Sequence, residues 1–343
     1  MANILCSIHL YPPMHVCGAE MMLHQMNRFL QSQGHTVKIL LKQANIYKID
    51  SHYVYDNVDV FPPDQYTEIS LFQWADAVFT HLDYSAWTQQ LAGMFGKPVF
   101  QIIHNDFPRE HIIGADRPQF IIYNSHWIKQ KLQYPHHDFV LHPPTDYRHY
   151  RIDMDAWDNE HITLINLDQN KGGEILRDIA KQMPNRKFLG VIGSYSEPMK
   201  IGQILDQPSN VRIMGKQQDI REAYKLTRIL IMPSKYESWG RTATEAMASG
   251  IPVIASPTDG LKENCGNAGI FVKDRDDVSE WVKAIEKLDD EKRYRKASAK
   301  AIERSIELDP THELNEMSQW MLGIINDYKS GNGSKYNHIN KGN

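Results

Sequence analysis

Short apolar runs alternate with segments of helical hydrophobic periodicity along most of the chain. The run Asn3–Ile8 is typical of a buried strand, and Ala19–Gln33 carries its apolar residues on one helical face. A helix stop at Gly34 precedes the next apolar run, Thr36–Leu41. Further strand candidates in this half are Ala77–Thr80, Pro98–Ile103 and Gln119–Tyr123. This alternation predicts an α/β protein with a parallel sheet and crossover helices.

The alternation is interrupted at His142–Asn159. This segment is polar and aromatic and contains prolines, which predicts a passage between two domains. The pattern then restarts with the strand candidates Ile162–Asn166, Lys187–Ile192, Val211–Met214, Ile229–Met232 and Val253–Ala255. We therefore expect two Rossmann-like, doubly wound domains. Because ligands of such sheets bind at the carboxyl ends of the strands, two units facing each other predict one central cleft.

The domain boundaries follow from the same pattern. The first domain is predicted to span residues 1–145 and the second residues 146–312. Val278–Tyr328 is helical by pattern, and its last part, about 313–328, is expected to pack back on the first domain. The tail 329–343 has too little apolar content to pack and is expected to be disordered.

Composition and charge narrow the class of protein. The 343 residues include 38 basic and 42 acidic side chains, a formal charge of −4, which disfavours a uniformly basic nucleic-acid binder. Cys6, Cys17 and Cys265 form neither a metal-ligand spacing nor an even disulfide set. The start MANILCSIHL lacks the features of a signal peptide, and no run approaches the roughly 18 apolar residues of a membrane span. We expect a cytoplasmic protein, with peripheral membrane contact left open.

Histidine placement and one acidic triplet raise the question of a metal. Thirteen of the 16 histidines lie between His9 and His149, but no pair has the His-Glu-x-x-His spacing of a zinc helix. Local composition is the simpler interpretation. The triplet Asp153-Met154-Asp155 falls in the interdomain segment and not at the end of an apolar strand, so it is interpreted as a solvated linker. No metal is predicted.

The most informative segment is Ile229–Ser256, in which an apolar strand, a short loop and a helix follow one another. The helix begins near Gly240, where unpaired backbone N–H groups and the positive end of the helix dipole favour a diphosphate. Gly240 also lets the backbone approach a ligand closely. Glu237 precedes the helix and Glu245 lies within it, where one carboxylate can accept from both hydroxyls of a ribose.

This segment resembles the signature of the retaining glycosyltransferases of family four, which have the GT-B fold. The signature has two glutamates separated by seven residues, followed by an alanine and a Gly-x-Pro-Val strand. Its counterparts in this sequence are Glu237, Glu245, Ala246, Gly250, Pro252 and Val253. The resemblance implies metal-independent transfer of a sugar from a nucleoside-diphosphate sugar, with retention of anomeric configuration and no cofactor.

Two motifs of the first half resemble the same family. His104 follows the apolar strand that ends at Ile103 and resembles the histidine presented to the transferred sugar. Gly18 resembles a glycine of the first loop, where backbone approaches the donor phosphates. The family usually has two glycines in that loop, whereas this chain has Cys17 before Gly18. The phosphate contact therefore depends on Gly18 alone.

In the second half, Lys171 resembles the lysine that the family places on the diphosphate. Many relatives carry an arginine five or six residues earlier, where this chain has Asn166, and Arg241 is the candidate to compensate. The catalytic residues implied by the resemblance are His104, Lys171 and Glu237. The implied donor-binding residues are Gly18, Asn166, Lys171, Met214, Gly215, Ser238, Trp239, Gly240, Arg241, Thr242 and Glu245.

The sequence does not name the donor; the resemblance makes a UDP-sugar the first expectation and a GDP-sugar the next, and the acceptor is left open among glycans, lipids and small molecules. One alternative is a transferase of the viral type that modifies bases in DNA. It needs a local basic surface, for which the candidates are Arg109, Arg117, Lys129 and Lys131. Another alternative is an inert nucleotide-sugar-binding protein. A glycoside hydrolase with Glu237 and Glu245 as its acid/base pair would leave the phosphate loops without a purpose.

Overall fold

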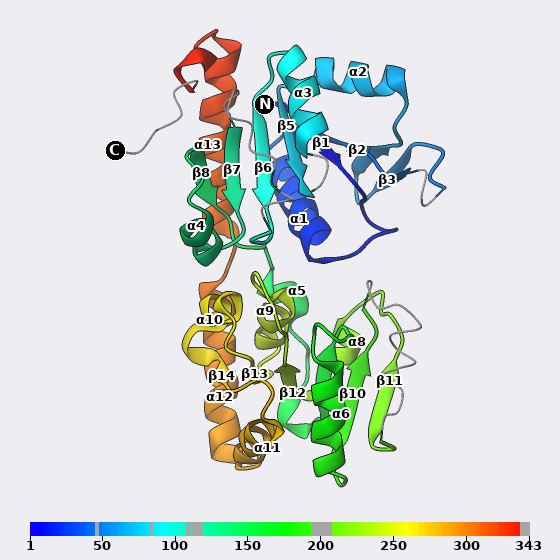
Figure 1. Cartoon of the computed structure of the whole chain (residues 1–343), viewed down its shortest axis with the longest axis vertical. Helices are drawn as coiled ribbons and strands as arrows, with labels where there is room; N and C mark the ends of the chain where they lie inside the picture. Colours follow the sequence, from blue (N-terminus) through cyan, green and yellow to red (C-terminus); the bar gives the residue numbers. More distant parts are fainter. Residues whose placement is uncertain (45–47, 83–84, 108–110, 112–118, 194–207, 337–343) are drawn as a thin grey trace. The chain divides into compact units, whose positions relative to one another are not determined.

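The computed structural model describes residues 1–44, 48–82, 85–107, 111, 119–193 and 208–336, which form two compact units. The first unit comprises Met1–Pro144 together with Pro310–Asn343, and the second unit comprises Thr145–Asp309. The chain thus passes between the units twice, after Pro144 and after Asp309. Each unit has its own sheet with helices against it (Figure 1).

The described part of the first unit has one eight-stranded sheet in the order β3-β4-β2-β1-β5-β6-β7-β8. Its strands are β1 (Asn3–Ile8), β2 (Thr36–Leu41), β3 (Tyr53–Tyr55), β4 (Val58–Phe61), β5 (Ala77–His81), β6 (Val99–Ile103), β7 (Gln119–Tyr123) and β8 (His137–Val140). Only the edge pair β3–β4 is antiparallel among these pairings. Strand order reverses between β1 and β5, and in doubly wound sheets such a switch point is where ligands bind.

Helices cover both faces of this sheet. They are α1 (Gly18–Ser32), α2 (Gln65–Trp74), α3 (Ser85–Met94), α4 (His126–Leu132) and the C-terminal α13 (Thr311–Lys329). Successive strand side chains point to opposite faces, so Cys6 packs with α1 and α13, while Leu5 packs with α2 and α3. Both residues are fully buried, as expected for the central strand of a parallel sheet.

Helix α13 belongs to the first unit although it follows the second in sequence. Met317 and Met321 are fully buried in the same core as α1. At the start of the helix, the Glu313 carboxylate accepts from the backbone N–H of His142 at 2.9 Å and lies 2.7 Å from its Nδ1. Figure 1 shows α13 beside β7 and β8. The chain therefore completes its first core with its last helix.

The described part of the second unit has a six-stranded sheet in the order β11-β10-β9-β12-β13-β14. Its strands are β9 (His161–Ile165), β10 (Lys187–Val191), β11 (Val211–Met214), β12 (Thr227–Met232), β13 (Val253–Ala255) and β14 (Ile270–Phe271). The pairings in this sheet are parallel. Strand order reverses between β9 and β12, which gives this unit a switch point of its own.

Two apolar layers enclose this second sheet. Its helices are α5 (Tyr147–Tyr150), α6 (Gly173–Gln182), α8 (Arg221–Tyr224), α9 (Arg241–Ala248), α10 (Asp259–Cys265), α11 (Val278–Lys287) and α12 (Glu291–Glu307). On β12, Leu230 packs with α9 and α10, whereas Ile231 packs with α6 and α11. Short 3-10 helices occur at Ala156–Asp158, Gly266–Ala268 and Gly333–Tyr336. Among the described residues, no helix is both long and apolar enough to cross a membrane.

The structure corrects two expectations of the sequence analysis. The tail from residue 329 was expected to be disordered, but it continues into the 3-10 helix at Gly333–Tyr336. The Tyr336 ring lies 5.0 Å from that of Phe120, and its hydroxyl donates to Asp327 at 2.5 Å, which attaches the segment to the first unit. Residues 337–343 of the same prediction lie outside the described residues.

The second correction concerns the predicted linker His142–Asn159, which contains helix α5 and a 3-10 turn. The Asp155 carboxylate accepts from the backbone N–H of Trp157 at 3.0 Å and pairs with Arg295. Asp155 is therefore a capping residue with an ionic partner, and the triplet that contains it is part of the second unit's fold.

Candidate functional site

The switch point of the second sheet brings together the two loops that carry the sequence motifs. Strands β9 and β12 are neighbours and run parallel, so the loops that follow them begin at the same edge. The first loop leads from β9 to α6 and contains Lys171. The second leads from β12 to α9 and contains Glu237.

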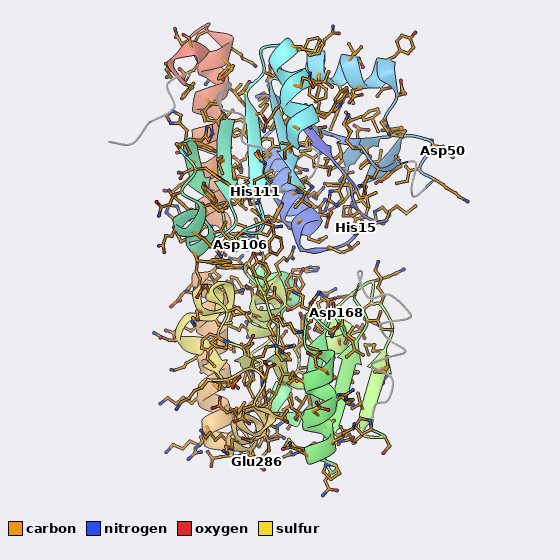
Figure 2. The ribbon with its side chains drawn as sticks, viewed as in Figure 1. His15, Asp50, Asp106, His111, Asp168 and Glu286 are labelled. Atoms are coloured by element: carbon orange, nitrogen blue, oxygen red, sulfur yellow. The ribbon has the colours of Figure 1, made fainter. Side chains whose placement is uncertain are left out.

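Lys171 and Glu237 form an ion pair across these loops, although 66 positions separate them. The lysine Nζ lies 2.5 Å from the Glu237 Oε1, which also accepts from the Ser234 hydroxyl at 2.9 Å. The Lys171 backbone N–H donates to the Asp168 carboxylate at 2.9 Å. Asp168 is labelled in Figure 2, which shows it at the end of the second unit where these loops lie. The Lys171 side chain is 28% exposed, so its charge is available to a ligand.

The backbone of the first loop depends on two left-handed residues. Asn166 has φ of 63° directly after β9, and Gly172 has φ of 90° directly before α6. Asparagine tolerates this region better than most residues with a side chain. A Cβ on Gly172 would lie 2.5 Å from Pro233 Cγ and 2.6 Å from the Pro233 carbonyl oxygen. The glycine thus allows the two loops to touch.

Gly240 stands directly before α9 with φ of 85°. A Cβ there would lie 2.7 Å from Leu261 Cδ2, and a Cβ on Gly260 would lie 2.3 Å from the Glu237 carbonyl oxygen. The sequence analysis assigned Gly240 to the close approach of a ligand. The structure adds a requirement within the protein, because the left-handed turn and the packing of α10 already need both glycines.

Glu245 lies inside α9 and is engaged from both sides. One carboxylate oxygen accepts from the Tyr224 hydroxyl at 2.9 Å, and the other lies 3.2 Å from the Arg241 guanidinium. Arg241 also donates to the Tyr150 hydroxyl at 3.0 Å. Burial raises the pKa of Tyr224 well above its ordinary value, so its phenol is a neutral donor. Arg241, expected on the diphosphate, is instead the partner of Glu245 with its side chain only 9% exposed.

The remaining predicted donor-binding residues differ in exposure and in their contacts within the second unit. The Trp239 side chain is buried at 3% exposure, and its carbonyl oxygen accepts from Asn264 at 3.1 Å. Thr242 donates to the Met232 sulfur at 3.7 Å. Among the described atoms, none lies within 4 Å of a Cβ built on Gly215, which follows β11 directly. Met214 and Ser238 are half-buried.

In the first unit, His104 follows β6 directly, as the sequence predicts. Its Nε2 lies 2.9 Å from Nδ1 of His81, and its carbonyl oxygen accepts from the Asn124 side chain at 3.0 Å. Burial lowers the pKa of His104 to about 4, so its imidazole is neutral at pH 7. Gly18 begins α1, and in the described part of the chain no atom lies within 4 Å of a Cβ built there.

Sequence analysis missed a cluster beside His104, which comprises His9, His15, Glu20 and His81. His9 follows β1 and His81 ends β5, so both lie at the first sheet's switch point. Glu20 lies 2.9 Å from His9 and 3.4 Å from His15. Burial alone would raise the pKa of Glu20, but these histidines hold it below the ordinary value. The signal available in the sequence was that His9 and His81 directly follow the strand candidates Asn3–Ile8 and Ala77–Thr80.

The DNA alternative requires a basic surface, and the charge of two of its four candidate residues is neutralised by ion pairs. Lys129 forms an ion pair with Asp138, and Lys131 forms one with Asp106. The other two candidates, Arg109 and Arg117, lie outside the described residues.

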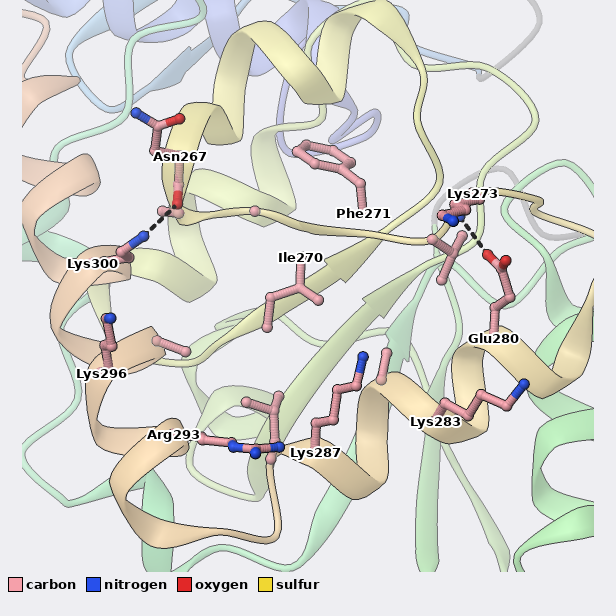
Figure 3. Close-up of a pocket in the computed structure, with 16 residues that line it drawn as sticks. Asn267, Ile270, Phe271, Lys273, Glu280, Lys283, Lys287, Arg293, Lys296 and Lys300 are labelled. Carbon is pink, nitrogen blue, oxygen red and sulfur yellow. Dashed lines mark hydrogen bonds between the residues drawn. The ribbon is translucent and has the colours of Figure 1, made fainter.

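A separate cavity of about 490 Å³ lies in the second unit between β14, α11 and α12 (Figure 3). Lysines line it, and the Lys300 ammonium donates to the Asn267 carbonyl oxygen at 3.3 Å. Glu280 accepts from the backbone N–H of Lys273. None of the predicted site residues contributes to this cavity, so the candidate active site is the pair of loops at the β9–β12 switch point.

The match to a known protein family lies within the second unit. Residues 162–290 match the family described as glycosyl transferases group 1. The D-inositol 3-phosphate glycosyltransferase of Corynebacterium diphtheriae is 28% identical over 156 residues, 40% of this chain and 36% of that protein. The N-acetyl-alpha-D-glucosaminyl L-malate synthase of Bacillus anthracis is 30% identical over 124 residues, 35% of this chain and 32% of that protein. This chain thus matches about a third of the length of these relatives.

Among solved structures, Anabaena HepE in complex with UDP-glucose is similar with a TM-score of 0.76 at 15% identity. The superposition covers 94% of this chain and 100% of HepE. The fold is therefore GT-B, with two Rossmann-like domains, as the sequence predicts. Within it, residues 162–290 match the family of group 1 glycosyl transferases, and the protein is similar to the glycosyltransferases of family four.

Proposed function

We propose that this protein transfers a sugar from a nucleoside-diphosphate sugar to an acceptor, with retention of anomeric configuration and without a metal ion. The observation that carries the proposal is the Lys171–Glu237 pair at the switch point of a group 1 glycosyl transferase domain. A UDP-sugar is the preferred donor. HepE, which has a similar fold, was solved with UDP-glucose, and this supports the choice.

Cleavage of the bond between sugar and diphosphate leaves negative charge on the departing phosphate. Lys171 and the backbone N–H groups at the start of α9 are the groups that stabilise this charge. Ion pairing with Glu237 holds the lysine in place before a ligand binds. Preorganised charge of this kind costs no rearrangement during the reaction. A lysine and a helix end in this role support transfer without a divalent cation.

Glu237 and Glu245 position the donor. Glu237 is only 10% exposed in its side chain and holds sugar hydroxyls, which restricts the orientation of the sugar. Glu245 accepts from the ribose hydroxyls. Its two oxygens offer about four acceptor sites, so the contacts with Tyr224 and Arg241 leave capacity for a ribose. Tyr224 and Arg241 then fix the orientation of the carboxylate.

Retention of configuration is proposed from the similarity to the glycosyltransferases of family four, and a front-face substitution of this kind needs no protein nucleophile. At the described loops the carboxylates are already committed, Glu237 to Lys171 and Glu245 to Arg241. In the first unit we assign the transferred sugar to His104 and the donor phosphates to Gly18. The neutral imidazole of His104 can donate or accept a hydrogen bond without adding charge.

A thermal-shift screen of the whole chain against UDP, GDP, ADP and UDP-sugars tests the donor. A ligand at 100 times its dissociation constant stabilises the folded state by about 2.7 kcal/mol, which a melting curve resolves. We expect UDP and at least one UDP-sugar to raise Tm, with EDTA leaving the shift unchanged.

Release of UDP from the same UDP-sugar then separates an enzyme from an inert binder. We expect slow release with water as acceptor, and NMR of the freed sugar reports whether its configuration is retained. A Tm unchanged by every nucleotide would refute the proposal. Turnover that requires added manganese would refute its metal-independent form.

A further inference from the structure

A second group of chemically active side chains lies at the switch point of the first unit. His9, Glu20 and His81 come from the end of β1, the first turn of α1 and the end of β5. Each offers one ligand atom, and these three atoms lie within 4.8 Å of one another. His15, labelled in Figure 2, stands in the loop between β1 and α1 and lies 3.4 Å from Glu20. Three separate elements therefore converge on one small volume.

Two buried ring nitrogens of this group lack a hydrogen bond. Glu20 and His81 are both fully buried at 0% exposure. Glu20 Oε1 lies 2.9 Å from Nε2 of His9, whereas among the described atoms none pairs with Nε2 of His81 or Nδ1 of His9. Buried polar groups are normally paired, so this concentration of unmet lone pairs in one place points to a missing partner.

His81 also has the second contact that a metal-binding histidine uses. Its Nδ1 lies 2.9 Å from Nε2 of His104, while its Nε2 faces no partner in the described residues. In metal sites the ring nitrogen that does not bind the ion is generally held by a hydrogen bond, which fixes the tautomer and the ring orientation. His104 supplies this contact.

We propose that His9, Glu20 and His81 bind a divalent transition-metal ion of the zinc type. Two imidazoles and one carboxylate form a donor set common for zinc, and the fourth position is left to water or an exogenous ligand. Imidazole ligands favour zinc, copper, nickel or iron over magnesium and calcium, which prefer oxygen. The ion supplies the partner that Nε2 of His81 lacks, and it lies between His9 and Glu20 in place of their direct contact.

A second set, His15, Cys17 and Glu20, meets the same distance criterion and shares the glutamate. His15 and Cys17 are already in contact, with the sulfur 3.9 Å from the histidine Nε2. The set with His81 is the better site because it includes the fully buried nitrogen that lacks a hydrogen bond. The two sets differ in a thiolate, which spectroscopy detects.

The proposed metal site lies within the first unit, and neither Lys171 nor Glu237 belongs to it. His81 contacts His104, to which the transferred sugar is assigned, but metal occupancy is measured without any sugar transfer, so the two proposals have separate readouts. The probe is cobalt(II), which adopts the zinc geometry and absorbs visible light when its coordination is tetrahedral. The whole chain is treated with EDTA, desalted and titrated with cobalt, then with zinc or magnesium.

We expect one equivalent of cobalt to give visible bands, zinc to abolish them and magnesium to leave them unchanged. Glu20→Gln and His81→Gln should each weaken cobalt binding by more than about tenfold. His52→Gln is the matched control, because His52 is 43% exposed in its side chain and pairs with Asp59 instead. Circular dichroism and Tm without metal verify that the variants fold. His9→Gln replaces any variant that does not.

Three results would overturn the proposal. The first is the lack of stoichiometric cobalt binding to the wild-type chain. The second is binding that survives in Glu20→Gln and His81→Gln as it does in His52→Gln. The third is a sulfur-to-cobalt charge-transfer band that disappears in Cys17→Ser, which would assign the ion to the other set.

Discussion

The two switch points differ in how they neutralise a buried carboxylate. In the second unit, Glu237 faces Lys171 and Glu245 faces Arg241, two cations whose charge is permanent at neutral pH. In the first unit, Glu20 faces imidazoles, whose charge depends on their surroundings. Both carboxylates of the second site thus have a cationic partner without a ligand, although Nη1 of Arg241 has no hydrogen bond among the described atoms. The first site has lone pairs that a ligand must satisfy.

The glycines of the two sites differ in backbone conformation and in how closely other atoms surround them. Gly172 and Gly240 adopt left-handed conformations and lie against other parts of the second unit. Gly18 has neither feature, because in the described structure nothing lies within 4 Å of its built Cβ. The second unit therefore preorganises its loops by close packing, whereas the first unit has open space at its loop. Close packing in the second unit suits a site that stabilises charge. Open space in the first unit suits a site whose partner varies.

Removal of the Lys171 ammonium gives the largest expected effect, which is on the rate of the reaction. In Lys171→Met the stem of the side chain remains but the charge is lost, and we expect release of nucleoside diphosphate to fall by about 10²–10³-fold. The measurement is the initial rate with a saturating UDP-sugar, together with Tm. Lys235→Met is the matched control, since Lys235 is exposed and stands in the other loop of the site. Equal rates in the two variants would mean that Lys171 does not stabilise the leaving group.

The difference between Gly172 and Gly18 predicts the next largest effect, which is on thermal stability. Gly172→Ala places a Cβ 2.5 Å from Pro233 Cγ in a left-handed residue, and the two penalties together are about 2–4 kcal/mol. For a unit of this size that lowers Tm by roughly 5–10 °C. Gly18→Ala meets no atom and should change stability by less than about 0.5 kcal/mol. Thermal denaturation of both variants tests this, and a larger loss in Gly18→Ala would reverse the comparison.

Much of the second unit could be predicted from the sequence because its signals are local. The run before Pro233 and the Gly-x-Pro-Val strand fix β12 and β13 around the site, and the predicted strands differ from the observed ones by only a residue or two at their ends. The GT-B fold is confirmed by the comparisons, and residues 162–290 match the group 1 glycosyl transferases. The roles of His104, Lys171 and Glu237 stay predictions.

The features that sequence analysis missed depend on contacts between distant residues. β3 and β14 are edge strands of two or three residues, too short for a periodic pattern. The pairing of Arg241 with Glu245 depends on rotamers within α9, and the cluster around Glu20 depends on the order of strands in the sheet. The ordered tail depends on Tyr336, which packs against Phe120. Sequence spacing does not encode these contacts directly.

Replacement of Glu313 gives the smallest expected effect and sharpens the comparison within the first unit, because this carboxylate is held by both the backbone and the ring of His142, whereas Glu20 is held by imidazoles. Burial alone would raise the pKa of Glu313, but hydrogen bonds from the His142 ring and backbone N–H lower it below its ordinary value. A carboxyl group whose pKa is lower in the folded state stabilises the fold above its unfolded pKa, about 4.3 for glutamate, and loses this contribution as the pH falls.

Glu313→Gln should therefore cost roughly 1 kcal/mol at pH 7, because the side chain is one-third exposed and solvent weakens the interaction. The difference from the wild-type chain should shrink as the pH falls below the unfolded pKa of about 4.3 and through the lower pKa of the folded state. Urea denaturation of both chains across this range measures it. Glu316→Gln, one turn further along α13 and exposed, is the control, and a constant difference at every pH would show that the loss at Glu313 is not ionic.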